Sequence, residues 1–336
     1  MWDNMPALKA ELDAFEQAML GKFRSHRNIN AHLDELSRDI LLSGGKRLRP
    51  AMTIASAMLG RYERDKVLDS AVSIELLHTA TLVHDDIIDN SPLRRSKPTV
   101  YAREGVVTAV FTGDYLLVKS LLALAATDIP QEHVVRLAQA VEAVCVGEVE
   151  QYHGRGRLPS FKTYLSRISR KTAALFAASC ALGAHLGGLT EEQVKAAGRF
   201  GGYYGIAFQI KDDLLDILES SANTGKPAGN DLKEGVVTLP VILAAGEAPQ
   251  VLARLDAVMS AAGGKKASKR DMLALSKRDM LALMKMVREA QGIERTQEVL
   301  TRYVARAARF LDKLPDTPGR DMLRTILDTS FSGYTA

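Results

Sequence analysis

Two short segments carry three aspartates in the same spacing, Asp-Asp-x-x-Asp, each inside an apolar helical pattern. They are Asp85, Asp86 and Asp89 in "HDDIID" and Asp212, Asp213 and Asp216 in "KDDLLD". Because residues four apart share a helix face, the outer aspartates of each motif stack one turn apart. Such pairs suit Mg²⁺, which binds one or two carboxylates and keeps positions for water or phosphate. An acidic, solvated helix end does not explain the apolar flanks, so the motifs predict two facing carboxylate walls with metal ions between them.

Basic side chains follow these motifs and supply what a diphosphate requires, since arginine and lysine are the usual clamps for phosphate oxygens. They occur in "LRRSKP", "SRKT", "TGKP" and "SGGKRLRP", of which the last lacks the spacing of a P-loop. Together with the aspartates they predict two diphosphate sites, one bridged by metal and one held by basic side chains alone. The residues concerned are Lys46, Arg47, Arg49, Arg94, Arg95, Lys171, Thr172 and Lys226.

The elements that position these side chains are expected to be helices. Segments 30–42, 68–89, 108–126 and 133–152 carry apolar residues at three- and four-residue spacing, and strand-like alternation is nearly absent. Helix boundaries are expected at Pro50, Pro130, Pro159 and Pro240. The pattern predicts an all-α bundle of roughly ten or more helices. Without a break in composition, 1–336 is expected to form a single domain.

One segment repeats itself without a mismatch. "SKRDMLAL" occurs at 268–275 and again at 276–283. A single copy of eight residues is too short for a repeat architecture, so we interpret it as a local duplication within one helix. The basic pairs Lys269-Arg270 and Lys277-Arg278 are expected to form a solvated face.

Composition excludes several classes of function. The 336 residues carry 44 basic and 40 acidic side chains, and the resulting formal charge of +4 is too small to indicate nucleic-acid binding. Two cysteines, Cys145 and Cys180, fit a reducing compartment rather than a disulfide framework. The stretch "YLLVKSLLALAA" contains Lys119 and is too short to span a bilayer. We therefore expect a cytoplasmic protein that is not transmembrane.

The order and spacing of the motifs resemble the trans-isoprenyl diphosphate synthases, or polyprenyl synthetases. The resemblance runs through "GGKRLRP", "ELLHTATLVHDDIID", "RR", "GDYL", "KTAALF", "FQIKDDLLD", "GKPAGNDLKEG" and "TLP", nearly the whole chain. It implies antiparallel helices around a deep central cavity, a prenyltransferase activity, isopentenyl diphosphate and an allylic diphosphate as substrates, and Mg²⁺, three ions with substrate bound. It also implies a dimer, expected here to be a homodimer, with a heterodimer containing a small subunit as the alternative.

The resemblance carries roles over to matching positions. Asp85, Asp89, Asp212 and Asp216 resemble the metal ligands, with Asp86 and Asp213 acting behind them or through water. Contacts to the allylic diphosphate are implied for Arg94, Lys171, Thr172, Gln209 and Lys226. Contacts to isopentenyl diphosphate are implied for Lys46, Arg49, His78 and Arg95.

Two positions depart from the family pattern. Ser96 stands where glycine is frequent, and Val236 stands where many members carry lysine. The second change puts one phosphate contact in doubt. The chemistry itself requires no protein base, because the departed diphosphate can take the proton, and we interpret His84 as structural.

Product length is expected to depend on the residues that line the cavity below Asp85. Thr81 and Ala80 lie one turn down the helix and Leu77 a further turn. Short-chain members close the cavity with an aromatic residue near the first two positions, so two small residues predict a product of C30 or longer, as used for quinone side chains. A bulky residue on a neighbouring helix would instead give geranylgeranyl or farnesylgeranyl diphosphate.

Two other classes of function remain as alternatives. A class I terpene cyclase also uses an aspartate motif with Mg²⁺, but it usually lacks the second motif and needs no second diphosphate site. A partner subunit that binds prenyl chains without catalysis would not require intact aspartates. A catalytic subunit that needs a small partner is compatible with every motif.

Overall fold

The computed structural model describes residues 2–23, 31–127, 129–218, 229–263 and 269–334. These residues are helical apart from turns and one short hairpin, so the predicted all-α class is confirmed. They group into two compact units, and each is described by itself. The expectation of a single domain spanning 1–336 stays a prediction.

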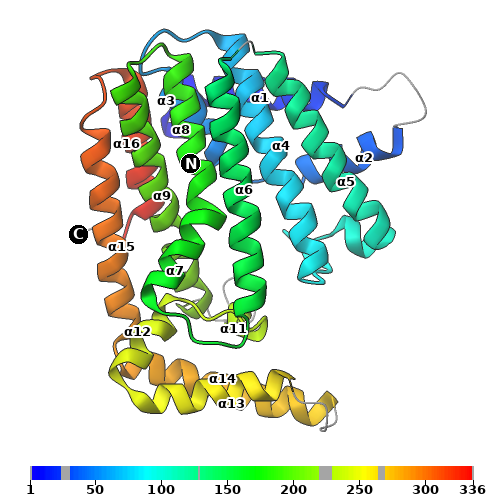
Figure 1. Cartoon of the computed structure of the whole chain (residues 1–336), viewed down its shortest axis with the longest axis vertical. Coiled ribbons are helices and arrows are strands. Elements are labelled where there is room, and N and C mark those ends of the chain that lie inside the picture. Colours follow the sequence, from blue (N-terminus) through cyan, green and yellow to red (C-terminus); the bar gives the residue numbers. More distant parts are fainter. Residues whose placement is uncertain (1, 24–30, 128, 219–228, 264–268, 335–336) are drawn as a thin grey trace. The chain divides into compact units, whose positions relative to one another are not determined.

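Unit 1 contains the described residues up to Val141, together with Leu175–Gly202 and Ala307–Thr329. The elements from the N-terminal part of unit 1 are drawn in blue to blue-green in Figure 1. The elements wholly within it are η1 (Trp2–Asn4), α1 (Pro6–Gly21), α2 (Ala31–Leu41), α3 (Leu48–Ala57), α4 (Arg64–Ile88), β1 (Leu93–Arg94), β2 (Lys97–Pro98) and α5 (Val100–Ala125).

Unit 2 contains Glu142–Ala174, Tyr203–Arg306 and the described residues from Ser330 onward. Its own elements are α7 (Phe161–Ile168), the π-helical turn η3 (Ser169–Ala173), α11 (Asn230–Lys233), α12 (Leu239–Glu247), α13 (Pro249–Gly263) and α14 (Lys269–Glu289). Five helices contribute residues to both units: α6 (Gln131–Gly154), α8 (Ala174–Leu186), α9 (Glu191–Leu218), α15 (Gly292–Leu311) and α16 (Pro318–Phe331). Helix α14 holds the duplicated segment from Lys269 onward, as predicted, but the side chains of the two basic pairs lie outside the described residues.

Helix α4 is the buried centre of unit 1 and carries the first aspartate motif at its end. Every residue from Ser70 to Leu77 is buried, polar ones included. The hydroxyls of Ser73 and Ser120 lie 2.9 Å apart, and the Ser120 hydroxyl also donates to the Ser73 carbonyl at 2.8 Å. Because a buried polar group without a partner costs free energy, these contacts fix α4 against α5.

An apolar cluster surrounds the middle of α4. Its buried members are Ile74, Leu77, Leu124, Leu137, Leu175 and Leu182. Complete burial of one such side chain contributes about 1.5–3 kcal/mol. The cluster therefore stabilises the packing of α4 against α5, α6 and α8.

The hairpin after α4 turns through two residues with left-handed backbone. Leu93 pairs with Pro98 and Arg94 with Lys97, while Arg95 and Ser96 form the turn at φ values of 51° and 63°. A two-residue hairpin of this kind favours glycine at the left-handed positions. The frequent glycine of the family at the place of Ser96 thus has a backbone cause, and Ser96 tolerates the same turn at some conformational cost.

Helix α5 is longer than the apolar stretch inside it. It contains 26 residues. Among the described residues it is the one helix that is long enough and apolar enough to cross a membrane. The apolar stretch lies within this longer helix, and the expectation that the protein is not transmembrane stays a prediction. One such helix is weak evidence for a membrane span, because core helices of soluble proteins share its length and composition.

Candidate active site

The first aspartate motif lies at the C-terminal end of α4. Asp85 and Asp89 are half-buried, and the Asp89 N–H donates to the Asp85 carbonyl at 2.9 Å, so the predicted one-turn relationship is retained where the helix ends. Asp86 is buried and accepts a hydrogen bond from Arg94 Nε at 2.9 Å. Burial raises the pKa of Asp86, and the Arg94 guanidinium opposes that rise. Arg94, expected at the allylic diphosphate, is thus held by the second aspartate of the motif.

The glycine pair of "SGGKRLRP" allows close approach of an arginine. Gly45 has a φ of 143°, and a Cβ at this position would lie 2.9 Å from both terminal nitrogens of Arg95. The chain then turns through Arg47 in left-handed conformation, and Lys46 remains exposed beside it. This loop therefore brings Arg95 against the segment that also holds Lys46.

Arg47 has a structural position that its place in the motif does not reveal. Its guanidinium is buried and donates to Glu75 of α4 at 2.7 Å, to Glu16 of α1 at 3.3 Å and to the carbonyl of Leu41. A buried charge requires such partners, and removal of one partner typically costs about 3–5 kcal/mol. Arg47 therefore fixes the loop, which leaves the neighbouring Lys46 and Arg49 as the cations of the motif.

His78 lies among the basic residues of unit 1. Burial lowers its pKa well below the ordinary value, and the nearby guanidinium groups lower it further, in the order Arg49, Arg95, Arg94 and Arg47. His78 is therefore neutral at physiological pH and can donate one N–H. The Arg49 guanidinium lies over the Phe176 ring, 4.3 Å from its centroid, which fixes its position. The structure thus brings Arg49, His78 and Arg95 together, while their contact with isopentenyl diphosphate stays a prediction.

The second aspartate motif lies on α9 in unit 2. Asp213 is buried and accepts hydrogen bonds from the Tyr164 hydroxyl at 2.6 Å and from Gln209 Nε2 at 3.0 Å. The Thr172 hydroxyl donates to Gln209 Oε1 at 2.7 Å. Burial raises the pKa of Asp213 to about 6, against the opposing effect of these donors. Thr172 and Gln209 therefore join the motif through a continuous hydrogen-bond chain, while Asp212 is exposed.

The residues after the second motif add a carboxylate that sequence reasoning missed. The backbone N–H groups of Asn230 and Asp231 donate to the Asp216 carboxylate at 3.0 and 3.3 Å. Burial raises the pKa of Asp231 to about 8, and the charges of Asp213, Asp216 and Glu234 add to the rise. The sequence did contain a sign of this carboxylate, because Asp231 lies in "GKPAGNDLKEG", a segment that belongs to the resemblance.

Lys171 and Thr172 lie in the π-helical turn between α7 and α8. Such turns are frequent at functional sites. Lys171 Nζ lies 2.8 Å from the Glu148 carboxylate of α6. A Cβ at Gly147 would lie only 2.8 Å from the Lys171 backbone nitrogen, so glycine is required for this close approach.

The remaining expected residues are placed as follows. The His84 ring packs against Gly113 of α5, with Nε2 3.3 Å from the Val110 carbonyl. Ala80 is buried and Thr81 half-buried, the latter donating to the His78 carbonyl at 2.8 Å. Lys226 lies outside the described residues. The two aspartate motifs belong to different units, so their facing arrangement stays a prediction.

The outer aspartates of the two motifs are the residues that could hold a metal ion. Among the described residues, no three acidic, histidine or cysteine side chains form a ready-made metal site. Mg²⁺ characteristically takes one or two carboxylates and completes its shell with water and substrate phosphates. The outer aspartates of the motifs supply this number of ligands.

Known proteins with similar sequences include synthases of long prenyl diphosphates. The sequence pattern described as polyprenyl synthetase matches residues 30–275. The chain is 38% identical to heptaprenyl diphosphate synthase component 2 of Geobacillus stearothermophilus, over 96% of this chain and 94% of that protein. It is 34% identical to nonaprenyl diphosphate synthase of Mycobacterium tuberculosis, over 98% of this chain and 94% of that protein.

A solved structure agrees in fold over almost the whole chain. The crystal structure of a decaprenyl diphosphate synthase from Rhodobacter capsulatus matches with a TM-score of 0.87 and 32% identity, covering 98% of each chain. The fold is thus that of the all-α isoprenoid synthases, and the aspartate motifs and basic residues described above lie within the matched region. The chain belongs to the polyprenyl synthetase family and is a prenyltransferase.

Proposed function

We propose that the protein is a Mg²⁺-dependent synthase that condenses isopentenyl diphosphate with an allylic diphosphate to give an all-trans polyprenyl diphosphate of C30 or longer. The observation that carries the proposal is the pair of Asp-Asp-x-x-Asp motifs in a chain of this family, with small residues below the first motif. The similar heptaprenyl, nonaprenyl and decaprenyl synthases support the long product.

The allylic diphosphate is assigned to the aspartates and to the residues of the π-helical turn. Asp85, Asp89, Asp212 and Asp216 would hold the metal, which supplies the charge neutralisation that lets the diphosphate leave. Lys171 would donate to a phosphate oxygen, and its ion pair with Glu148 holds the ammonium before substrate binds. Thr172 and Gln209 are expected to contact the same diphosphate and are held by their hydrogen bonds to each other and to Asp213.

Isopentenyl diphosphate is assigned to the basic residues of unit 1. Arg49, Arg95 and the exposed Lys46 supply charge, and neutral His78 supplies a hydrogen bond. The double bond of the bound molecule attacks the allylic cation, a carbon–carbon bond forms, and the proton passes to the departed diphosphate. No general base from the protein is needed, which agrees with the packing of His84 against Gly113.

Product length is proposed to depend on the depth of the channel below Asp85. Ala80 and Thr81 leave that position open, which favours a long product. One observation supports the shorter alternative: Leu77 belongs to the apolar cluster with Leu124 and Leu137. If these side chains do not move aside, they form the floor and the product is geranylgeranyl or farnesylgeranyl diphosphate.

The test is incubation of the purified chain with isopentenyl diphosphate, farnesyl diphosphate and Mg²⁺, followed by chromatography of the dephosphorylated products. We expect products of C30 or longer and none when Mg²⁺ is chelated. Products that stop at C20 or C25 would support the leucine floor. A cyclic hydrocarbon without elongation would indicate a terpene cyclase, and no reaction would indicate a chain that needs a partner subunit.

A homodimer is proposed from the exposed apolar face of α5. Val107, Phe111, Val118 and Leu122 retain 69%, 60%, 50% and 61% of their exposure. Their spacing of four, seven and four residues forms a stripe suited to packing against another helix. Light scattering is expected to give a dimer mass, and Phe111→Glu is expected to give monomers. A monomeric wild-type chain without activity would instead favour a heterodimer with a small subunit.

The two cysteines bear on where the protein is located in the cell. The free cysteines, exposed Cys145 and buried Cys180, are compatible with the reducing cytoplasm inferred above. We infer a cytoplasmic enzyme, which fractionation of expressing cells would test.

A further inference from the structure

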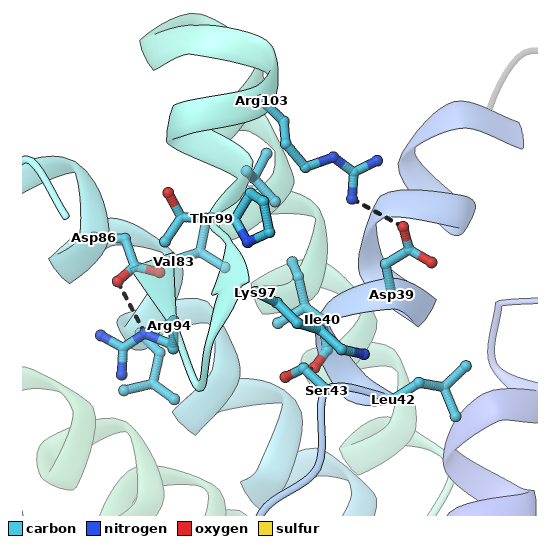
Figure 2. Close-up of a pocket in the computed structure, with 13 residues that line it drawn as sticks. Asp39, Ile40, Leu42, Ser43, Val83, Asp86, Arg94, Lys97, Thr99 and Arg103 are labelled. Carbon is cyan, nitrogen blue, oxygen red and sulfur yellow. Dashed lines mark hydrogen bonds and ion pairs between the residues drawn. The ribbon is translucent and has the colours of Figure 1, made fainter. Parts of the chain in front are cut away.

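A cavity of unit 1 lies beside the first aspartate motif and shares Asp86 and Arg94 with it. Its volume is about 340 Å³, which falls within the range of small-molecule pockets, about 300–1,000 Å³. The walls come from the end of α2, the C-terminal part of α4, the hairpin and the start of α5, as Figure 2 shows. The proposed reaction gives its other lining residues no role.

Two ion pairs brace its walls. Arg94 Nε lies 2.9 Å from Asp86 Oδ1, and Arg103 Nη1 lies 2.9 Å from Asp39 Oδ2 (Figure 2). Each pair compensates its own charge. The second pair also joins α5 to α2, so it holds the cavity open from the side opposite the hairpin.

Lys97 is the lining cation that these pairs do not neutralise. It belongs to β2, and Figure 2 shows its side chain extending across the cavity toward Leu42 and Ser43. Within the described part of the chain, its ammonium has no ion-pair or hydrogen-bond partner. The cavity therefore presents one uncompensated positive charge.

The rest of the lining is largely apolar. Ile40, Leu82, Val83, Pro98 and Val100 contribute hydrocarbon surface around the Lys97 side chain. A pocket with apolar walls and one charged group binds ligands that have an apolar part and an opposite charge. Burial of the ligand's apolar part stabilises the complex, and the charge fixes the ligand's orientation. A small inorganic anion would leave the apolar wall without a partner.

We propose that this cavity binds an amphipathic anion, with one carboxylate or phosphate head at Lys97 and an aliphatic body against the α4 wall. Arg94 also lines the cavity, and its guanidinium is paired with Asp86. A ligand whose body lies against the α4 wall would hold this pair in place and keep Arg94 from the substrate. Occupancy would then raise KM for the allylic diphosphate, a coupling that rests on the function proposed for Arg94, whereas binding itself does not.

Binding is tested by calorimetry with octyl phosphate, octanoate, inorganic phosphate and octanol as probes. We expect both amphipathic anions to bind with one site per chain, and phosphate and octanol to bind at least tenfold more weakly. Lys97→Met, which keeps the apolar stem and removes the charge, should weaken anion binding roughly tenfold. Lys66→Ala, an exposed lysine at the other end of α4, should leave it unchanged.

Two results would overturn the site. One is equal anion binding by wild type and Lys97→Met. The other is binding lost in Arg49→Ala but kept in Lys97→Met, which would locate the probe in the predicted diphosphate site. An unfolded variant is recognised by its circular dichroism, and Lys97→Gln then replaces Lys97→Met with the same expectation.

The coupling is tested separately by kinetics. Lys97→Met should keep its activity within about twofold, because Lys97 has no role in the proposed reaction. Octyl phosphate should raise KM for the allylic diphosphate in the wild type and not in this variant. An unchanged KM overturns the coupling. A wild-type protein without synthase activity would overturn the proposed function. It would not affect the conclusion from the calorimetric binding test.

Discussion

The ammonium of Lys171 lies 2.8 Å from the carboxylate of Glu148, where a π-helical turn meets α6 at Gly147. Both side chains are largely shielded, with 26% and 18% of their surfaces exposed, so the pair is less screened than one on the open surface. Glu148 was not among the residues expected from the sequence. Its position makes it the partner that orients the Lys171 side chain.

Replacement of Glu148 tests this relationship. Glu148→Ala should raise KM for the allylic diphosphate roughly tenfold, because Lys171 loses the partner that orients it. Lys171→Ala should lower kcat/KM roughly 100-fold, because a charged donor to the diphosphate is removed. Steady-state kinetics checks both, and Glu148→Asp should restore part of the effect. Glu150→Ala removes the neighbouring exposed pair with Arg170 and should change little.

Two glycines of α6 provide a matched test of the close approach. Gly147→Ala should lower the free energy of unfolding by about 1–3 kcal/mol, because its Cβ would collide with the backbone nitrogen of Lys171. Gly154→Ala meets nothing within 4 Å and should be neutral or stabilising by up to about 1 kcal/mol. Urea denaturation measures both. Equal effects of the two substitutions would show that Gly147 is not needed for packing.

Asp231 is expected to oppose stability while it serves the metal site. Its pKa of about 8 means that ionisation in the folded protein is unfavourable, so Asp231→Asn should raise the free energy of unfolding without Mg²⁺ at pH 8.5. The same variant should require more Mg²⁺ for half-maximal activity, because a nearby carboxylate is lost. Asp256→Asn, at an exposed aspartate of α13, serves as the control. Lower stability of Asp231→Asn in the absence of metal would contradict this account.

A stacked histidine pair predicts a pH dependence of stability. The ring centroids of His133 and His185 lie 3.6 Å apart. Burial lowers the pKa of both rings, and the charge of His185 lowers the pKa of His133 further. Arg136 opposes protonation of either ring, while Glu132 and Glu191 favour it. Since the unfolded chain then binds more protons, stability should fall as pH drops below about 6.5 toward the lowered values.

The substitution His185→Phe isolates this contribution, because it keeps an aromatic ring and removes one titrating group. We expect the loss of stability between pH 7 and pH 5.5 to be smaller in the variant than in the wild type, as measured by urea denaturation. The comparison between proteins is needed because the raised pKa values of Asp213 and Asp231 act in the opposite direction. Identical pH profiles would rule out the histidine pair as a source.

Ala80→Phe tests the channel. An aromatic ring one turn below Asp85 should shorten the product, which chromatography of the dephosphorylated prenols detects. Leu77→Ala should lengthen it if Leu77 belongs to the floor, at a stability cost of about 2–5 kcal/mol. Ile54→Val, a change in the buried core of α3, controls for destabilisation by itself. Unchanged product length in both channel variants would refute depth control by α4.

The sequence was most informative where the relationships are local. Asp85 and Asp89 lie one turn apart because helix geometry relates residues four positions apart, and the apolar periodicity of 68–89 was sufficient to predict that helix. The basic residues were recognisable by type. Their partners were not: Arg47 and Arg49 stand in one motif, yet Arg47 is buried against Glu75 while Arg49 lies beside His78.

The sequence by itself determined the all-α class, the two aspartate motifs and the family to which they belong. Only the tertiary structure decided that Asp86 holds Arg94, that Glu148 holds Lys171, and that Asp231 joins the second motif. The physical reason is distance along the chain: a helical period relates neighbours within one turn. A charge finds a partner 8, 23 or more residues away only once packing has fixed both elements.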